Sequence, residues 1–136
     1  MAADPDSQPL LEARAISKRF GGVRALEGVS ASFRAGEVVA VMGENGAGKS
    51  TLMKCLAGVH QPNAGEVAVD GNLVSIPDVR AAEKLGIAFI HQELNLAENL
   101  NIGANVFLGR EPRKFGPFFD RREIRLRTQG LLDALE

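Results

Sequence analysis

The chain contains no tryptophan or tyrosine and only one cysteine, Cys55. Any aromatic contact with a ligand must therefore come from one of its seven phenylalanines. A single cysteine cannot form a disulfide within the chain, and residues 1–5 lack the basic and apolar stretches of a secretory signal. These absences predict a protein of a cytosolic, reducing compartment, in which Cys55 is most simply a small buried apolar residue.

Long apolar segments and an excess of one charge are also lacking. The longest uninterrupted apolar run is Val38-Val39-Ala40-Val41-Met42, much shorter than the roughly 18 residues of a membrane-spanning helix. The formal net charge is −1, which argues against nucleic acid as a partner. With 45% apolar and 24% charged residues among 136, the composition is that of a soluble folded domain and not of a disordered chain.

Most of the chain divides into short predicted elements. Residues 1–9 have no apolar period and are expected to form a flexible leader. Alternating apolar and polar residues, interrupted by glycine-containing turns, then predict a series of strands, and Gly71-Asn72 marks a hairpin. These strands are expected over residues 11–16, 29–33, 66–70 and 73–76, and a short helix is expected over residues 79–85.

Two apolar runs differ from these alternating segments. Residues 38–42 are apolar at every position, which predicts a central strand covered on both faces, as in the parallel sheets of α/β proteins. A glycine-rich loop follows, and residues 49–57 carry apolar side chains at helical spacing up to Gly58. A second apolar run at residues 87–90 predicts another strand. A strand, a loop and a helix in direct succession indicate an α/β fold.

The loop matches the phosphate-binding pattern G-x-x-x-x-G-K-[ST] at every fixed position. Glycines let backbone N–H groups curl around an anion, and the N-terminus of the following helix adds positive partial charge. Lys49 is expected to reach the β- and γ-phosphates of a nucleotide, and Ser50 to ligate Mg²⁺. The alternative is a glycine-rich strand-to-helix turn with an incidental lysine. The residues of the loop motif are Gly43, Glu44, Asn45, Gly46, Ala47, Gly48, Lys49 and Ser50.

The chain also resembles the ATP-binding-cassette (ABC) ATPases, and specifically the ATP-binding subunits of monosaccharide importers of the ribose, galactose and xylose type. The stretches that carry the resemblance are residues 17–26, 43–52, 62–66 and 86–96. It covers nearly everything from Leu10 onward. It implies a P-loop NTPase fold of the α/β class, as part of an ABC-type nucleotide-binding domain with an antiparallel β subdomain. ATP and Mg²⁺ are the cofactors that it implies.

Three residues gain a role in nucleotide binding from this resemblance. Phe20 stands where the family carries an aromatic residue that stacks on adenine, and Val23 is expected to pack against the base. Thr51 is expected near the α-phosphate. From the residues alone, Phe20 could be part of a small apolar core.

The resemblance also implies residues that take part in hydrolysis. Gln92 follows an apolar run, where the family carries a glutamine that touches Mg²⁺ and the attacking water and connects to the membrane subunit. Lys49 and Gln92 are therefore the catalytic candidates, and Ser50 and Gln92 the candidate metal ligands. From spacing alone, Gln92 could be a solvated loop residue. Glu93 and Leu94 point to monosaccharides, since the related nucleoside importers differ there.

Other parts of a cassette ATPase have no match in this sequence. The family carries a second strand that ends in Asp-Glu, a Leu-Ser-Gly-Gly-Gln type signature and a switch histidine. The one similar stretch, Val67-Ala68-Val69-Asp70, runs into Gly71-Asn72, so Asp70 is interpreted as a turn residue. Residues 10–136 are thus expected to be the N-terminal part of a first cassette, ending before the signature and the second strand. Alone, the chain is expected not to turn over ATP.

The implied protein is the ATPase subunit of a sugar importer, bound at the cytoplasmic face of the inner membrane. Its implied partners are ATP or ADP, the permease membrane subunits and a second nucleotide-binding cassette. Three alternatives remain open at this point: an importer ATPase for nucleosides or other small solutes, a small P-loop kinase, and a non-catalytic nucleotide-binding module.

The last third of the chain is basic. Between Arg110 and Arg127, seven basic residues stand against three acidic ones, a local balance of +4. This segment could be a solvated helix face, a surface attracted to an anionic membrane, or a contact with another part of a longer protein. Asp120 and Glu123 resemble a capping box at the start of a final helix, and Ile124, Leu131, Leu132 and Leu135 mark one face of that helix.

Overall fold

The computed structural model of the chain describes residues 8–91 and 96–135. It divides into two compact units, residues 1–90 and residues 91–136. Among the described residues, no helix has both the length and the apolar character needed to cross a bilayer. Most of the expected leader, residues 1–7, lies outside the described residues, and so does Gln92.

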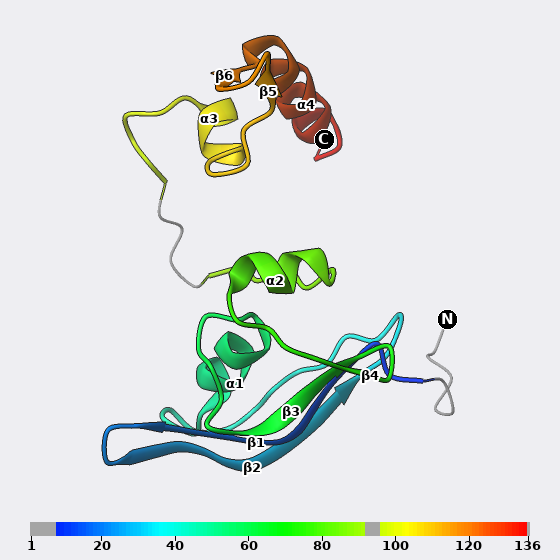
Figure 1. Cartoon of the computed structure of the whole chain (residues 1–136), viewed down its shortest axis with the longest axis vertical. Coiled ribbons are helices and arrows are strands. Elements are labelled where there is room, and N and C mark those ends of the chain that lie inside the picture. Colours follow the sequence, from blue (N-terminus) through cyan, green and yellow to red (C-terminus); the bar gives the residue numbers. More distant parts are fainter. Residues whose placement is uncertain (1–7, 92–95, 136) are drawn as a thin grey trace. The chain divides into compact units, whose positions relative to one another are not determined.

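The first unit is built on a four-stranded antiparallel sheet with the strand order β2-β1-β3-β4 (Figure 1). β1 (Leu11–Phe20) and β2 (Val23–Phe33) form a long hairpin. β3 (Ala64–Val69) pairs with the other edge of β1, and β4 (Asn72–Val74) adds the outer strand. The structure thus confirms the antiparallel β subdomain that the sequence predicts.

A bulge in β1 decides which of its side chains reach the core. Strict alternation would place Ala13 and Ile16 on opposite faces of the sheet. The pairing register with β2 shifts between these two residues, and Ala15 adopts a φ of +50°. The extra residue turns both Ala13 and Ile16 inward, with exposed fractions of 2% and 0%.

The core of this unit lies between the sheet and α1 (Lys49–Leu56). The helix lies over the sheet in Figure 1, with α2 (Val79–Lys84) beyond it. The Asp78 carboxylate caps α2 by accepting a hydrogen bond from the Ala81 N–H at 2.8 Å. The buried residues of the core are Ala13, Ile16, Leu26, Leu52, Cys55, Leu56, Val67, Ile76 and Ala82.

The turn between β3 and β4 confirms the interpretation of Asp70. Asp70 and Gly71 have φ values of +48° and +75°, the left-handed pair that a tight two-residue hairpin turn requires. The Asp70 N–H donates to the Leu10 carbonyl at 3.0 Å, and the Asn72 amide donates to the Asp70 carbonyl at 3.1 Å. The N–H of Asp70 thus links the turn to the residue before β1, and its carbonyl is bonded inside the turn.

Two predicted strands are wrong. Residues 38–42 and 87–90 form no strand in the structure, and both sheets of the described residues are built without them. Val38 and Met42 are almost fully exposed, and Ile90 is 86% exposed. The apolar pattern shows that these segments suit a buried strand, but a strand exists only when neighbouring strands complete its hydrogen-bond ladder.

The second unit contains two helices and a small hairpin: α3 (Ile102–Val106), β5 (Arg113–Lys114), β6 (Phe118–Phe119) and α4 (Arg121–Asp133). Asn105 stabilises the loop before α3 through side-chain hydrogen bonds. Its side-chain oxygen accepts from the Ala97 N–H at 2.8 Å, and its amide group donates to the carbonyls of Ala97 and Leu100.

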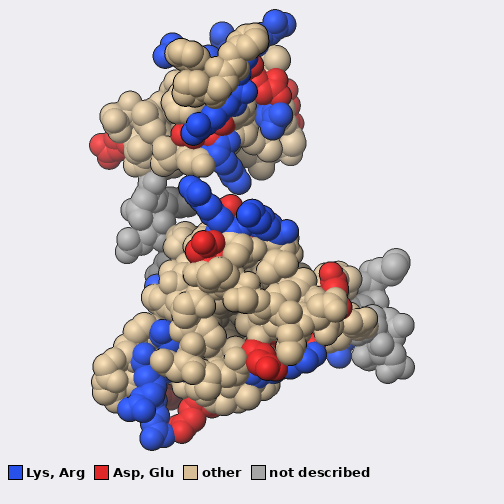
Figure 2. Space-filling view, in the orientation of Figure 1, with Lys and Arg blue, Asp and Glu red and all other residues tan. Residues whose placement is uncertain are grey.

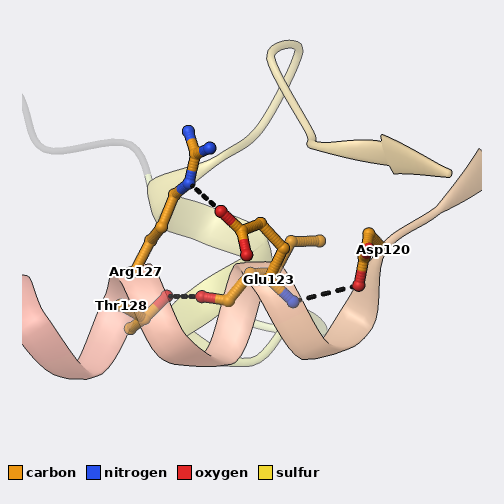
Figure 3. Close-up of polar contacts among 5 residues, drawn as sticks. Asp120, Glu123, Arg127 and Thr128 are labelled. Atoms are coloured by element: carbon orange, nitrogen blue, oxygen red, sulfur yellow. Dashed lines mark hydrogen bonds and ion pairs between the residues drawn. The ribbon is translucent and has the colours of Figure 1, made fainter.

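The start of α4 forms only half of the predicted capping box. The Asp120 carboxylate accepts from the Glu123 N–H at 3.0 Å (Figure 3). The Glu123 carboxylate binds Arg127 Nε at 2.7 Å and does not reach back to the Asp120 N–H, which already donates to the Pro112 carbonyl. In a complete capping box the two side chains would each bind the other residue's N–H. Here Asp120 alone caps the helix, and Glu123 forms an ion pair along the helix surface.

The predicted apolar face of α4 is covered only near its beginning. Gly103 of α3 lies close to the side chains of Ile124 and Thr128. The Thr128 hydroxyl donates to the Ile124 carbonyl at 2.7 Å (Figure 3). Farther along, Leu131, Leu132 and Leu135 are exposed. Helix α3, with five residues, is too short to cover these leucines.

Packing at the β1 bulge gives a test of this core. Replacing Ile16, which is fully buried, with alanine should lower the free energy of unfolding by about 2–5 kcal/mol, because the transfer of the side chain is lost and a cavity remains. Urea unfolding followed by circular dichroism would measure this. Ile90→Ala is the matched control at an 86% exposed site, with an expected change within about 0.5 kcal/mol. Equal losses in the two variants would contradict the described core.

Candidate functional site

The glycine-rich loop, residues 43–48, leads directly into α1, as the sequence predicts. The Ala47 N–H donates to the Glu44 carbonyl at 3.1 Å, which closes a turn inside the loop. The side chains of Glu44, Asn45 and Ala47 face solvent. The backbone of the loop, and not these side chains, is therefore available to a ligand at the start of α1.

Gly48 allows the end of the loop to pack directly against the β1–β2 hairpin. Its φ is +87°, and a Cβ atom at this position would lie 2.4 Å from the Ala25 carbonyl oxygen and 2.8 Å from Leu26 Cδ2. Any side chain here would collide with the backbone of β2. Only glycine combines this left-handed backbone with so close an approach. The first turn of α1 is thereby fixed against β2.

Lys49 spans the opening of the loop. Its ammonium group donates to the Gly43 carbonyl at 2.6 Å and to the Glu44 carbonyl at 2.7 Å. An ammonium group has three donors, so one of them is left for an anion that approaches the loop. The side chain is held in place at its charged end, and its positive charge lies among the backbone groups of the loop.

The N-terminus of α1 offers a row of backbone donors. Gly48 provides no side-chain cap, and the first helical hydrogen bond runs from the Leu52 N–H to the Gly48 carbonyl at 2.9 Å. The N–H groups of Lys49, Ser50 and Thr51 precede that bond and have no partner within the helix. These donors and the helix dipole favour a bound anion, and the exposed Ser50 hydroxyl lies beside them.

Phe20 and Val23 face each other across the end of the β1–β2 hairpin. Val23 is exposed and Phe20 is 43% exposed, so both present apolar surface to solvent. Ala25, which touches the Gly48 position, is two residues from Val23, about 7 Å along the strand. The structure thus brings this apolar hairpin end close to the loop.

Two residues that sequence reasoning missed surround the Phe20 ring. Lys18 Nζ lies 5.1 Å from the ring centroid and donates to the Gln61 carbonyl at 2.5 Å. The His60 ring meets Phe20 edge-on, with centroids 5.1 Å apart. Lys18 could have been found from strand periodicity, since it shares a strand face with Phe20. His60 lies 40 positions away along the chain, and no local signal connects it to Phe20.

A cavity of about 400 Å³ lies beside α1 but contains none of the loop residues. Its walls are Cys55, residues 61–67 in part and residues 73–76 of the β4 region. Cys55 is buried, as the sequence predicts, and burial raises the pKa of its thiol, while the charge of Lys18 works in the opposite direction. The thiol is therefore protonated near neutral pH and acts as a packing group.

The Gly48 contact can be tested by adding a single methyl group. Gly48→Ala should destabilise the first unit by more than 1 kcal/mol, because the left-handed backbone and the Ala25 carbonyl both exclude a Cβ atom. Thermal unfolding would measure the change. Gly22→Ala is the control, since its φ is not positive and no atom lies within 4 Å of a Cβ there. Equal midpoints for the native chain and Gly48→Ala would show that the loop is not seated on β2.

Comparison with known proteins identifies the family of the chain. A family model described as ABC transporter matches residues 26–135. A ribose/galactose/methyl galactoside import ATP-binding protein of Burkholderia cenocepacia is 57% identical over 119 residues, which cover 87% of this chain and 23% of that protein. The ribose import ATP-binding protein RbsA of Chromobacterium violaceum is 52% identical over 122 residues, covering 90% of this chain and 24% of that protein. The chain thus spans about a quarter of the length of these curated relatives.

Solved structures show the same fold. The ATP-binding cassette MJ0796, a dimer in a post-hydrolysis state bound to ADP and Pi, superposes with a TM-score of 0.69 at 26% identity, covering 90% of this chain and 56% of that one. The ADP conformation of the cassette MJ1267 gives a TM-score of 0.51 at 33% identity, covering 53% and 28%. The P-loop NTPase fold expected from the sequence is confirmed. With the family model matching most of its length, this chain belongs to the ABC transporter family of ATP-binding cassettes.

Proposed function

We propose that the first unit binds ATP or ADP together with Mg²⁺ through residues 43–51. The observation that carries the proposal is the position of Lys49, whose ammonium group is held by the carbonyls of Gly43 and Glu44 at the N-terminus of α1. A triphosphate brings several negative charges, and this site offers a lysine, a helix dipole and backbone N–H groups within one short segment. Phosphate oxygens are the acceptors that best fit such a set of donors.

Each element of the site has a distinct task in this proposal. The N–H groups at the start of α1 hold the phosphates, and Lys49 neutralises charge on the β- and γ-phosphates. The exposed Ser50 hydroxyl, one residue beyond the lysine, is an oxygen ligand of the kind that Mg²⁺ prefers. When bound, the ion would neutralise phosphate charge. Thr51 lies on the following position of the helix and is assigned to the α-phosphate. Gln92, proposed as a second metal ligand and catalytic residue, falls outside the described residues.

The base is proposed to lie at the end of the β1–β2 hairpin. The Phe20 ring is partly exposed, and Val23 pairs with it across the hairpin. Stacking on such a ring contributes roughly 0.5–1.5 kcal/mol beyond the burial of its area, so Phe20 adjusts affinity and the loop provides most of it.

In the longer protein, nucleotide binding is proposed to drive sugar import. The support comes from the relatives, whose names describe ribose and galactose import, and from the dimeric state of the cassette MJ0796. On this proposal the complete subunit is an ATPase on the cytoplasmic face of the inner membrane. Its partners are the permease subunits, near residues 92–94, and a second cassette that closes over the nucleotide.

Removing the Lys49 charge tests the binding proposal. Lys49→Ala should weaken Mg²⁺-ATP binding by roughly 10- to 150-fold, because one charge-assisted contact contributes about 1.5–3 kcal/mol. Isothermal titration calorimetry of the purified chain would measure the affinity. Lys54→Ala, at the other end of the same helix, removes the same charge and should leave the affinity unchanged.

The titration, together with an assay of phosphate release and transfer by the same two proteins, has three outcomes that decide between the candidate functions. Equal affinity of the native chain and Lys49→Ala would refute the loop as the nucleotide site. Binding without phosphate release above that of Lys49→Ala is the expected result, since binding and water activation use different groups. Lys49-dependent transfer of phosphate to an acceptor other than water would favour a small kinase.

A further inference from the structure

The hairpin of β5 and β6 exposes three aromatic side chains. Phe115, Phe118 and Phe119 are 85%, 70% and 55% exposed. Phenylalanine has no polar group and is among the residues most often buried in folded proteins. Three such rings within five positions concentrate exposed apolar surface at one short hairpin, and exposed apolar surface of this kind marks an interaction site. We call residues 113–119 the aromatic hairpin.

The backbone at the tip of the aromatic hairpin is unusual. Phe115 adopts a φ of +51°, in the left-handed region that bulky side chains rarely enter. Gly116 follows with a φ of +83°. In this turn the Phe115 ring is left largely in solvent. A glycine or asparagine would form this turn more easily, so the fold itself gives no reason for an aromatic side chain here.

Basic side chains surround these rings. The Arg113 guanidinium lies 6.0 Å from the centre of the Phe119 ring, and Lys114 Nζ lies 5.4 Å from the centre of the Phe115 ring. Figure 2 shows further Lys and Arg side chains over the visible surface of this unit. Within its described residues, the one ion pair to a carboxylate is that of Arg127 with Glu123. Arg121, Arg122 and Arg125, which are exposed at the start of α4, make no ion pair with a carboxylate of these residues.

We propose that the aromatic hairpin and these three arginines form a docking surface for an anionic lipid bilayer. Exposed rings on a hairpin can enter a fluid interface, which adapts to their shape without a preformed groove. Anionic headgroups match the three exposed arginines, and each basic side chain near such a surface raises affinity about five-fold. Phenylalanine suits the acyl boundary because it has no hydrogen-bonding group to satisfy there. An acidic protein segment would match the charges but would leave the apolar rings unexplained.

This surface goes beyond the nucleotide site, since it lies in the other unit and shares no residue with the loop. It predicts a chain that attaches to anionic membranes with or without nucleotide. Failure of the lipid experiment would leave the binding of ATP untouched, and the reverse is also true.

The absence of tryptophan from the chain allows a direct test. Phe118→Trp introduces a single tryptophan at the aromatic hairpin. Vesicles of equal parts phosphatidylglycerol and phosphatidylcholine should shift its emission to shorter wavelength and carry the chain upward in a flotation gradient. Vesicles of phosphatidylcholine alone should do neither. Phe20→Trp, which places the reporter in the first unit, should show no shift on either kind of vesicle.

A pair of matched triple variants tests the charges. Replacing Arg121, Arg122 and Arg125 with glutamine should weaken binding to the anionic vesicles on the order of 100-fold. The control variant replaces Arg19, Arg80 and Lys84, exposed residues of the first unit, and removes the same net charge. It should bind within about two-fold of the native affinity. Circular dichroism of both variants checks that each remains folded.

Four results would overturn the proposal. They are an unchanged Phe118→Trp emission on anionic vesicles, equal binding to neutral vesicles, equal losses in the two triple variants, and preference for polyglutamate over anionic vesicles at equal charge. The last of these would assign the surface to an acidic protein segment instead of a membrane.

Discussion

The close approach of Gly48 to β2 is the contact on which the candidate site depends. Because no Cβ atom separates the two backbones, the start of α1 lies directly against Ala25 and Leu26. That single contact fixes the direction of the first-turn N–H groups and the point from which Lys49 extends. It also sets the loop beside the hairpin that carries Phe20 and Val23. A phosphate site and an apolar platform for a base therefore belong to one rigid arrangement of α1 on the sheet.

The sequence predicts the local features of this unit well, and the reasons are physical. The hairpin turn at Asp70-Gly71, the cap at Asp78 and the glycine-rich loop before α1 are each decided by a few neighbouring residues. Such signals act over one turn of the chain and are visible without tertiary structure. The loop motif belongs to the same class, since its chemistry lies in eight consecutive residues.

The failures occur where distant residues decide the outcome. Residues 38–42 and 87–90 have the composition of buried strands, yet a strand needs hydrogen-bonding neighbours that an apolar pattern cannot supply. The bulge in β1 overrides simple alternation and brings Ile16 into the core. His60 reaches Phe20 across 40 positions of the chain. Residues of the loop were predictable, but their surroundings were not, because surroundings depend on packing between elements remote in sequence.

The central claim is that the loop and the first turn of α1 bind the phosphates of a nucleotide. Its most direct test is a titration of the ¹⁵N-labelled chain with Mg²⁺-ADP, followed by the backbone amide resonances. The account predicts that the largest chemical-shift changes fall on residues 43–51, with smaller changes near Phe20 and Val23 and none in α4. The account would be contradicted if the amide resonances of residues 43–51 did not shift while resonances elsewhere in the chain shifted to saturation.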